Sequence, residues 1–264
     1  MVKTADLLTP LYNLLEERLH EGGVLQMDET SVQVLKEPGK APQSKSYMWV
    51  RARDGTTGPP IVLYDYFPTR SGEVVAKILA GYEGTLQTDG YKGYGSFTLN
   101  REITHIGCLA HCRRKFWQAF KASKKAKNSH AEYAVQWFQK IYKIEAKGKK
   151  MSVEERLAHR QKHMTKLFSD FKVWLEATAS QVPASLKTGE AISYMLGEWD
   201  KITPLLEDGR IPLDNNFIEG KIRPFTIGRK NWMFSDTQKG AHASAMIFSI
   251  VETAKANELE PFAY

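Results

Sequence analysis

The stretch LDNNFIEGKIRPFTIGRKNWMF, from Leu213 to Phe234, brings acidic, basic and aromatic residues together, and the rest of the chain can be arranged around it. Asp214 is well placed as the N-cap of a helix, with Glu219 in the second turn and Arg223 four residues later on the same face. Pro224 is expected to end or kink this helix, which leaves residues 228–232 as a basic loop. A carboxylate in such a cationic stretch suggests a divalent metal ion beside a phosphodiester. The alternative is an exposed Glu219 paired with Arg223.

Composition limits the class of protein. With 264 residues and 42% apolar content, the chain can bury a full core, as one domain with an insertion or as two modest domains. The sequence contains no apolar run long enough to cross a bilayer, and its first residues lack the pattern of a signal peptide. Cys108 and Cys112 are too few for a disulfide framework. We therefore expect a cytoplasmic protein with no membrane partner.

The positive charge is concentrated in one segment. The net charge is +7, and residues 113–172 contain 17 Lys and Arg but only 5 Asp and Glu, so the remainder is slightly acidic. This distribution is typical of a surface that neutralises phosphates. The alternative is a helical region whose solvated faces are rich in lysine.

The chain reads as a strand-rich half followed by a helical block. Leucines between Leu7 and Leu19 share one side of a first helix. Residues 24–35, 46–52 and 61–67 then predict an antiparallel meander, and residues 85–88 and 103–107 predict two short strands. A helix is expected at 73–80, helices dominate from 109 to about 207, and a last helix covers 240–257. Aromatic stripes in the helical block indicate packing.

This order predicts an α/β protein with a ribonuclease H-like mixed sheet, flanking helices and an all-helical insertion before the last catalytic helix. We divide the chain into an N-terminal helix (1–23), the first part of the core (24–120), the insertion (121–207) and the C-terminal part of the core (208–264). In a ribonuclease H-like sheet the first and fourth strands are neighbours. Asp28, Asp89 and Glu219 could then meet at one edge.

Three carboxylates at one sheet edge could hold two hard cations for phosphoryl transfer. Asp28 is the natural bridging ligand because it lies in a strand, where Asp is otherwise unfavourable. Each residue also has an ordinary interpretation, since Asp89-Gly90 is a common turn pair and Asp214 is a helix cap. Glu29 is another carboxylate of the right type. The combination of all three residues, and no single one, indicates a metal site.

A rival metal site would use His105, Cys108, His111 and Cys112. These side chains have the right types for zinc, but they are crowded across one strand-to-helix junction, whereas structural zinc usually takes ligand pairs from two separate segments. Arg113, Arg114 and Lys115 follow directly on the next helix. We interpret these three cations as phosphate contacts.

The motifs MDETSVQVL, LQTDGYKGY, HIGCLAHCRRKFW and DNNFIEGKIRPFTIGRKNWMF, with the trailing SIVETAKANELEP, closely resemble the catalytic domain of the insertion-sequence sixty-six family of bacterial DDE transposases. The resemblance runs from Leu7 to Tyr264. It implies a ribonuclease H-like fold and an acidic triad of Asp28, Asp89 and Glu219 that binds Mg²⁺ or Mn²⁺. The DNA-binding residues that we expect are Arg113, Arg114, Lys115, Arg223, Arg229, Lys230 and Trp232.

The function that follows from this resemblance is cleavage at transposon ends and transfer of the freed 3′-OH to target DNA. The partners would be the transposon ends and the target, bound by a homo-oligomer associated with the nucleoid. Two alternatives stay open: a nuclease that hydrolyses without joining, and a non-catalytic DNA-binding remnant. The family's usual N-terminal leucine-zipper-like or helix-turn-helix part and its zinc-finger-like segment have no counterpart here. We therefore expect a truncated copy or an excised domain.

Overall fold

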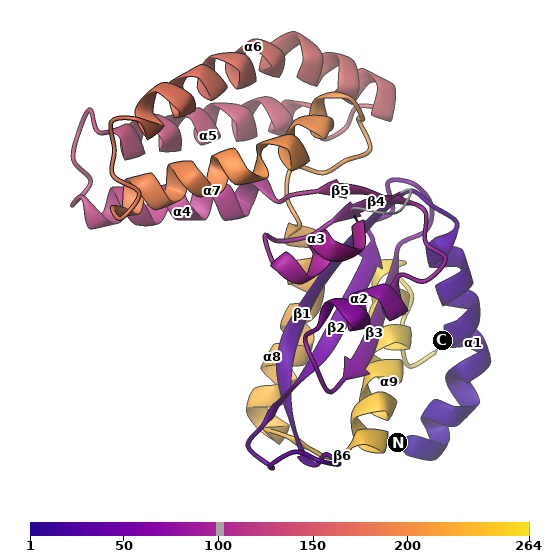
Figure 1. Ribbon diagram of the computed structural model, residues 1–264. Helices are drawn as coiled ribbons and strands as arrows, with labels where there is room; N and C mark the ends of the chain where they lie inside the picture. The colour runs from indigo at the N-terminus through magenta and orange to yellow at the C-terminus, as the bar shows by residue number, and fades with distance from the viewer. Residues whose placement is uncertain (99–102, 264) are drawn as a thin grey trace. The chain divides into compact units, whose positions relative to one another are not determined.

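The chain forms two compact units, one made of Met1–His105 with Asn215–Tyr264 and the other of Ile106–Asp214. The computed structural model describes residues 1–98 and 103–263 (Figure 1). The helical unit takes in Leu109–Ala122, which the sequence places in the first part of the core.

A six-stranded mixed sheet forms the centre of the first unit, within the part of the chain that the structure describes. The strands are β1 (Val24–Lys36), β2 (Lys45–Arg53), β3 (Ile61–Phe67), β4 (Gly84–Gln87), β5 (Ile103–Ile106) and β6 (Ser235–Thr237). Their order is β3-β2-β1-β4-β5, and β6 pairs with the far end of β1. The predicted antiparallel meander of β1, β2 and β3 is confirmed. The expected neighbourhood of the first and fourth strands is also confirmed, because β1 pairs with β4 in parallel.

Helices cover both faces of this sheet. They are α1 (Val2–His20), α2 (Gly72–Ile78), α3 (Lys92–Thr98), α8 (Asn216–Trp232) and α9 (Gln238–Ala256). Leu25 and Met27 of β1 pack in one core with residues of α1 and α2 and with Tyr94, whereas Val32 and Val34 pack in a second core with α8 and α9. Odd-numbered residues of β1 therefore face α1, α2 and α3, and even-numbered residues face α8 and α9, as the two-residue period of a strand requires.

The helix α1 is attached to the sheet by a buried charge. Arg51 of β2 is 1% exposed and forms ion pairs with Glu16 of α1 at 2.5 Å and with Asp65 of β3 at 2.9 Å. The predicted leucine face of this helix is only partly correct, because Leu7 is 82% exposed. Ala5, Tyr12 and Leu19 are the buried positions of α1.

The second unit is a bundle of α4 (Leu109–Ala122), α5 (His130–Lys147), α6 (Val153–Ala179) and α7 (Lys187–Ile202), followed by the short helix η1 (Thr203–Leu206). The packed pairs are α4 with α5, α5 with α6, α6 with α7, and α7 with α4, which closes a ring. Trp137 of α5 stacks on Phe171 of α6 with ring centroids 4.1 Å apart. The interpretation of the aromatic stripes as packing is therefore confirmed.

Helix α8 departs from its predicted bounds at both ends. The predicted cap is wrong: the N-cap is Asn215, and the Asp214 carboxylate instead accepts a hydrogen bond from the Tyr142 hydroxyl. The predicted end at Pro224 is also wrong, since the helix continues to Trp232 and residues 228–232 are helical. Proline removes the N–H that would bond to Gly220, but Gly220 is exposed, so water can satisfy its carbonyl.

Candidate active site

Asp28 lies in the middle of β1 on the face toward α8. Asp28 is half-buried, and its Oδ1 accepts a hydrogen bond of 2.7 Å from the Glu29 amide. Burial raises the pKa of Asp28 to about 7. The negative charges of Glu29, Asp89 and Glu219 contribute to this rise in pKa, whereas the hydrogen bond from the Glu29 amide opposes it. Asp28 is therefore held in a region of accumulated negative charge.

Asp89 follows the carboxyl end of β4, the parallel neighbour of β1. Its Oδ1 accepts a hydrogen bond of 2.9 Å from the Tyr91 amide, so the Asp-Gly pair does form the ordinary turn that its sequence indicates. The preceding Thr88 hydroxyl donates to the Asp89 carbonyl at 2.8 Å and also lies 2.8 Å from Nε2 of His105. Because Gln87 and Gln26 are register partners, this turn begins beside the part of β1 that carries Asp28.

Glu219 lies in the first turn of α8 and is half-buried. Its amide donates to the Asn215 carbonyl at 3.1 Å, the first bond of the helix. The amide of the preceding residue, Ile218, donates to Gln26 Oε1 at 3.1 Å, so this turn of α8 lies against β1. The three predicted residues thus come from β1, the end of β4 and the start of α8.

The donor chemistry of this group fits a hard divalent cation. Carboxylate oxygens are the ligands that Mg²⁺ prefers, and carboxylates that repel one another are stabilised by a cation. In the arrangement that the structure describes, no three His, Cys, Asp or Glu side chains are already close enough to hold one ion. Mg²⁺ is commonly bound through one or two carboxylates, with water and phosphate oxygens as its other ligands.

Glu29 faces the opposite side of the sheet, as its odd position in β1 dictates. Its side chain is 3% exposed, forms an ion pair with Arg70 and accepts a 2.7 Å hydrogen bond from the Tyr94 hydroxyl. The Arg70 guanidinium also lies 3.6 Å above the Tyr91 ring. The adjacent carboxylate is therefore already compensated by protein groups.

Two buried glutamines, which were not among the predicted site residues, connect the three elements. Gln26 and Gln87 are register partners in β1 and β4, and Gln26 Nε2 donates to Gln87 Oε1 at 2.7 Å. Gln26 Oε1 accepts a 3.1 Å bond from the Ile218 amide of α8. The signal was present in the sequence, since a glutamine precedes each of Asp28 and Asp89 by two residues.

The chain is similar to known proteins over most of its length. The family model described as Transposase IS66 family matches residues 1–243. The chain belongs to the IS66 transposase family. It is 31% identical to the uncharacterized protein y4hP of Sinorhizobium fredii (strain NBRC 101917 / NGR234), covering 97% of this chain and 49% of the relative, and 34% identical to y4qI of the same strain, covering 96% and 48%. The chain thus spans about half the length of the curated relatives it matches.

The cations predicted to bind DNA in this IS66-family chain differ in their exposure and in their hydrogen bonds to other protein groups. Arg113, Arg114 and Lys115 are exposed on α4, with Arg113 5.7 Å from the Tyr142 ring and Lys115 5.5 Å from the Tyr194 ring. Arg223 and Lys230 are exposed on α8.

The remaining two predicted contacts have partners inside the protein. Arg229 donates to the Ser31 carbonyl and, at 3.2 Å, to the Thr30 hydroxyl, so its guanidinium joins α8 to β1. Trp232 is half-buried and packs against Phe225 with ring centroids 5.2 Å apart. As DNA contacts, both residues stay predictions, but each also has a structural role.

The rival zinc residues form no metal group within the described ranges. Cys108 and Cys112 are buried and form no disulfide, and burial raises the pKa of the Cys112 thiol well above its usual value. A buried thiol of this kind stays protonated. His105 is bonded to Thr88 instead.

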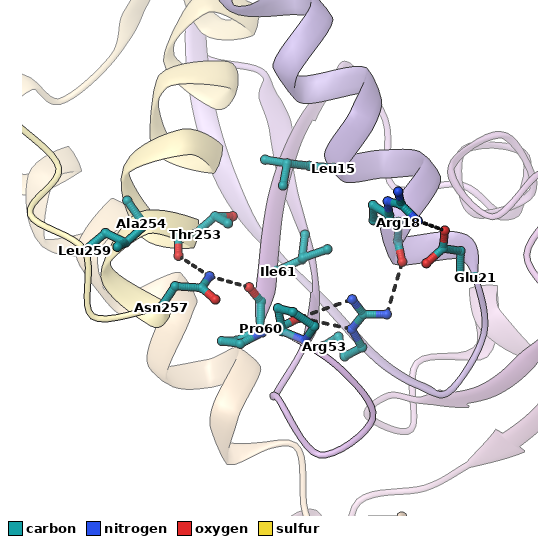
Figure 2. A pocket seen from close by; sticks show the side chains of 11 residues that line it. Leu15, Arg18, Glu21, Arg53, Pro60, Ile61, Thr253, Ala254, Asn257 and Leu259 are labelled. Carbon is teal, nitrogen blue, oxygen red and sulfur yellow. Dashed lines mark hydrogen bonds and ion pairs between the residues drawn. The ribbon is translucent and has the colours of Figure 1, made fainter. Parts of the chain in front are cut away.

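A cavity of about 650 Å³ lies in the same unit of this IS66-family chain, between the end of α1, the β2–β3 turn and the end of α9 (Figure 2). Its polar side chains are already bonded: Arg53 donates to the carbonyls of Pro59 and Arg18, and Asn257 donates to that of Pro60. None of the three candidate carboxylates lines it.

In the described part of the chain, no helix is long and apolar enough to span a membrane.

Proposed function

We propose that this chain is the catalytic domain of a DDE transposase, with a ribonuclease H-like fold, which cleaves DNA at transposon ends and joins the 3′-OH to target DNA. The observation that carries the proposal is that Gln26 of β1 is bonded to Gln87 of β4 and to the Ile218 amide of α8, because each bonded residue lies one or two positions from Asp28, Asp89 or Glu219. The mixed sheet with its flanking helices is compatible with that fold. Membership of the IS66 transposase family supports the reaction.

The proposed cofactor is Mg²⁺ or Mn²⁺. Asp28, Asp89 and Glu219 would hold it, with Asp28 shared between two ions. Such ions, when bound, activate a water or 3′-hydroxyl and stabilise the leaving oxygen. The protein contributes a strand and a turn that fix two carboxylates, and a helix start that supplies the third. Glu29 stays outside this group because Arg70 and Tyr94 compensate its charge.

The proposed partner is DNA, bound by a homo-oligomer. The second unit supplies a cationic surface: Arg113, Arg114 and Lys115 are exposed on α4 and no acidic residue lies beside them in sequence. Such a surface suits the phosphate backbone and not a particular base sequence. Arg223 and Lys230 on α8 would add contacts close in sequence to Glu219.

The test is a strand-transfer assay with a pre-cleaved duplex made from the DNA that flanks the coding sequence, with Mg²⁺ or with EDTA. We expect metal-dependent joining to a target plasmid, and loss of joining in Asp28→Asn, Asp89→Asn and Glu219→Gln. Hydrolysis without joining would instead indicate a nuclease. DNA binding with neither reaction would indicate a non-catalytic remnant, and either result would overturn the proposal.

A further inference from the structure

Gln26 and Gln87 are polar side chains in a place where apolar ones would be expected. They are 1% and 0% exposed, and both lie in the central strands of the sheet. Burying a polar amide is unfavourable unless its hydrogen bonds are satisfied, and a buried network of this kind specifies one particular arrangement of its elements. The arrangement specified here joins β1, β4 and α8.

The orientation of the Gln26 amide follows from its partners. A backbone N–H can only donate, so the atom that faces Ile218 must be Oε1 of Gln26. Its Nε2 is then directed at Gln87, where it donates to Oε1 at 2.7 Å. The two hydrogen bonds, from the Ile218 amide to Gln26 and from Gln26 to Gln87, thus form a bridge in which each donor and acceptor is defined.

The bridge also supplies what α8 lacks at its start. The third residue of a helix usually donates its amide to the side chain of the N-cap, but Asn215 makes no such capping bond. Ile218 occupies this third position, and Gln26 accepts its amide from across the sheet. The first turn of α8 is therefore capped by the Gln26 side chain of β1. This bond fixes the position of the first turn relative to the strand.

Each bonded group lies next to a candidate metal ligand. Gln26 precedes Asp28 by two residues and so shares its face of β1, and Gln87 precedes Asp89 by two. Ile218 directly precedes Glu219. We infer that Gln26 and Gln87 are positioning residues that set the relative placement of Asp28, Asp89 and Glu219 for divalent metal binding. This inference rests on the proposed function.

The experiment is a thermal melt of the full chain titrated with Mn²⁺, which reports metal binding without any catalytic reaction, because a ligand of the native state raises the melting temperature. The variants are Gln26→Met and Gln87→Met. The matched control is Thr253→Val, which removes a buried hydroxyl that also joins a helix to a strand, since this hydroxyl bonds to both the amide and the carbonyl of Val62.

We expect Gln26→Met to raise the half-saturating Mn²⁺ concentration by about 10- to 100-fold, the usual effect of losing a group that orients metal ligands. Gln87→Met should have a smaller effect in the same direction, because the bond from Gln26 to Ile218 survives. Thr253→Val should lower the melting temperature and leave the half-saturating concentration unchanged. If Gln26→Met does not fold, Gln87→Met alone decides the question.

Two outcomes would overturn the inference, and they are distinguishable. A parent that responds to Mn²⁺ through Asp28, with glutamine variants that respond at the parent's concentration, refutes the positioning role and leaves the proposed function intact. A parent whose melting temperature is the same with and without Mn²⁺, and equal to that of Asp28→Asn, refutes the metal site itself.

Discussion

The Tyr94 hydroxyl donates a hydrogen bond of 2.7 Å to Glu29. Together with the ion pair from Arg70, this bond compensates the carboxylate that is adjacent in sequence to Asp28. The neighbouring carboxylates point to opposite faces of β1, because side chains alternate along a strand. Glu29 is held by Arg70 and Tyr94. Asp28 lies on the other face of β1, and the negative charges of Asp89 and Glu219 contribute to its raised pKa.

The first prediction concerns Glu29. Glu29→Gln keeps the acceptor for Tyr94 but removes the charge that pairs with Arg70, and because the Glu29 side chain is buried we expect a loss of about 1–3 kcal/mol in the free energy of unfolding. Nicking activity should stay within a few-fold of the parent. Urea denaturation and a nicking assay measure both. Complete loss of nicking in a variant with normal stability would place Glu29 among the metal ligands.

The second prediction separates catalysis from folding at Asp28. Asp28→Asn keeps the volume and removes the charge, so cleavage and joining should disappear. In EDTA the variant should melt at the parent's temperature or above it, because the carboxylates repel one another without metal. Added Mg²⁺ should stabilise the parent more than the variant. An active Asn variant would exclude Asp28 as a ligand, and an inactive one that melts far below the parent in EDTA would make Asp28 structural.

The third prediction is the pH dependence of this difference. The pKa of Asp28 is raised to about 7 in the folded protein, from 3.8 in the unfolded chain. The folded state therefore binds more protons between these values, and the contribution of Asp28 to stability falls as the pH rises from 4 to 7. In EDTA, the stability advantage of Asp28→Asn should grow over this range, by at most about 4 kcal/mol. Urea denaturation of both proteins at pH 4 to 8 would show it, and a constant difference would refute the raised pKa.

The fourth prediction concerns the exposed cations of α4. Neutralising Arg113, Arg114 and Lys115 together to Gln should weaken DNA binding similarly for all sequences. The slope of log affinity against log salt concentration should become shallower by up to about 3, since each lost phosphate contact removes about 0.9. The control neutralises three exposed lysines outside this segment, Lys3, Lys36 and Lys255. Equal slopes in parent and α4 variant would mean that this face is only solvated.

The fifth prediction concerns the stability of the helical unit. Arg160 is fully buried, pairs with Glu145 at 2.5 Å and donates to the carbonyls of Leu205 and Ile211. Arg160→Met leaves these partners uncompensated and should cost about 3–5 kcal/mol. Lys166→Met, in the same helix, breaks an exposed pair with Asp170 and should cost less than about 1 kcal/mol. Similar costs in urea denaturation would contradict the structural role of Arg160.

Local patterns predicted most of the secondary structure. Runs of apolar and β-branched residues bounded by glycine and proline predicted β3 with its observed bounds, and β1 and β2 to within one residue at each end. Two short elements, α3 and β6, were missed. A three-residue strand such as β6 carries little signal of its own and exists because it pairs with Val34 and Lys36 of β1.

The candidate carboxylates could be named from the sequence because strand order makes β1 and β4 neighbours, and their motifs resemble those of a known family. The amino-acid sequence by itself therefore determined the strands β1 to β5, the aromatic helical core and the family. Tertiary structure decided where α8 begins, because its third amide is capped by Gln26 from another element. Tertiary structure also decided that Arg229 donates to the Ser31 carbonyl of β1 and that Leu7 is exposed. These features depend on partners that are remote in sequence, and local periodicity and propensity carry no information about such partners.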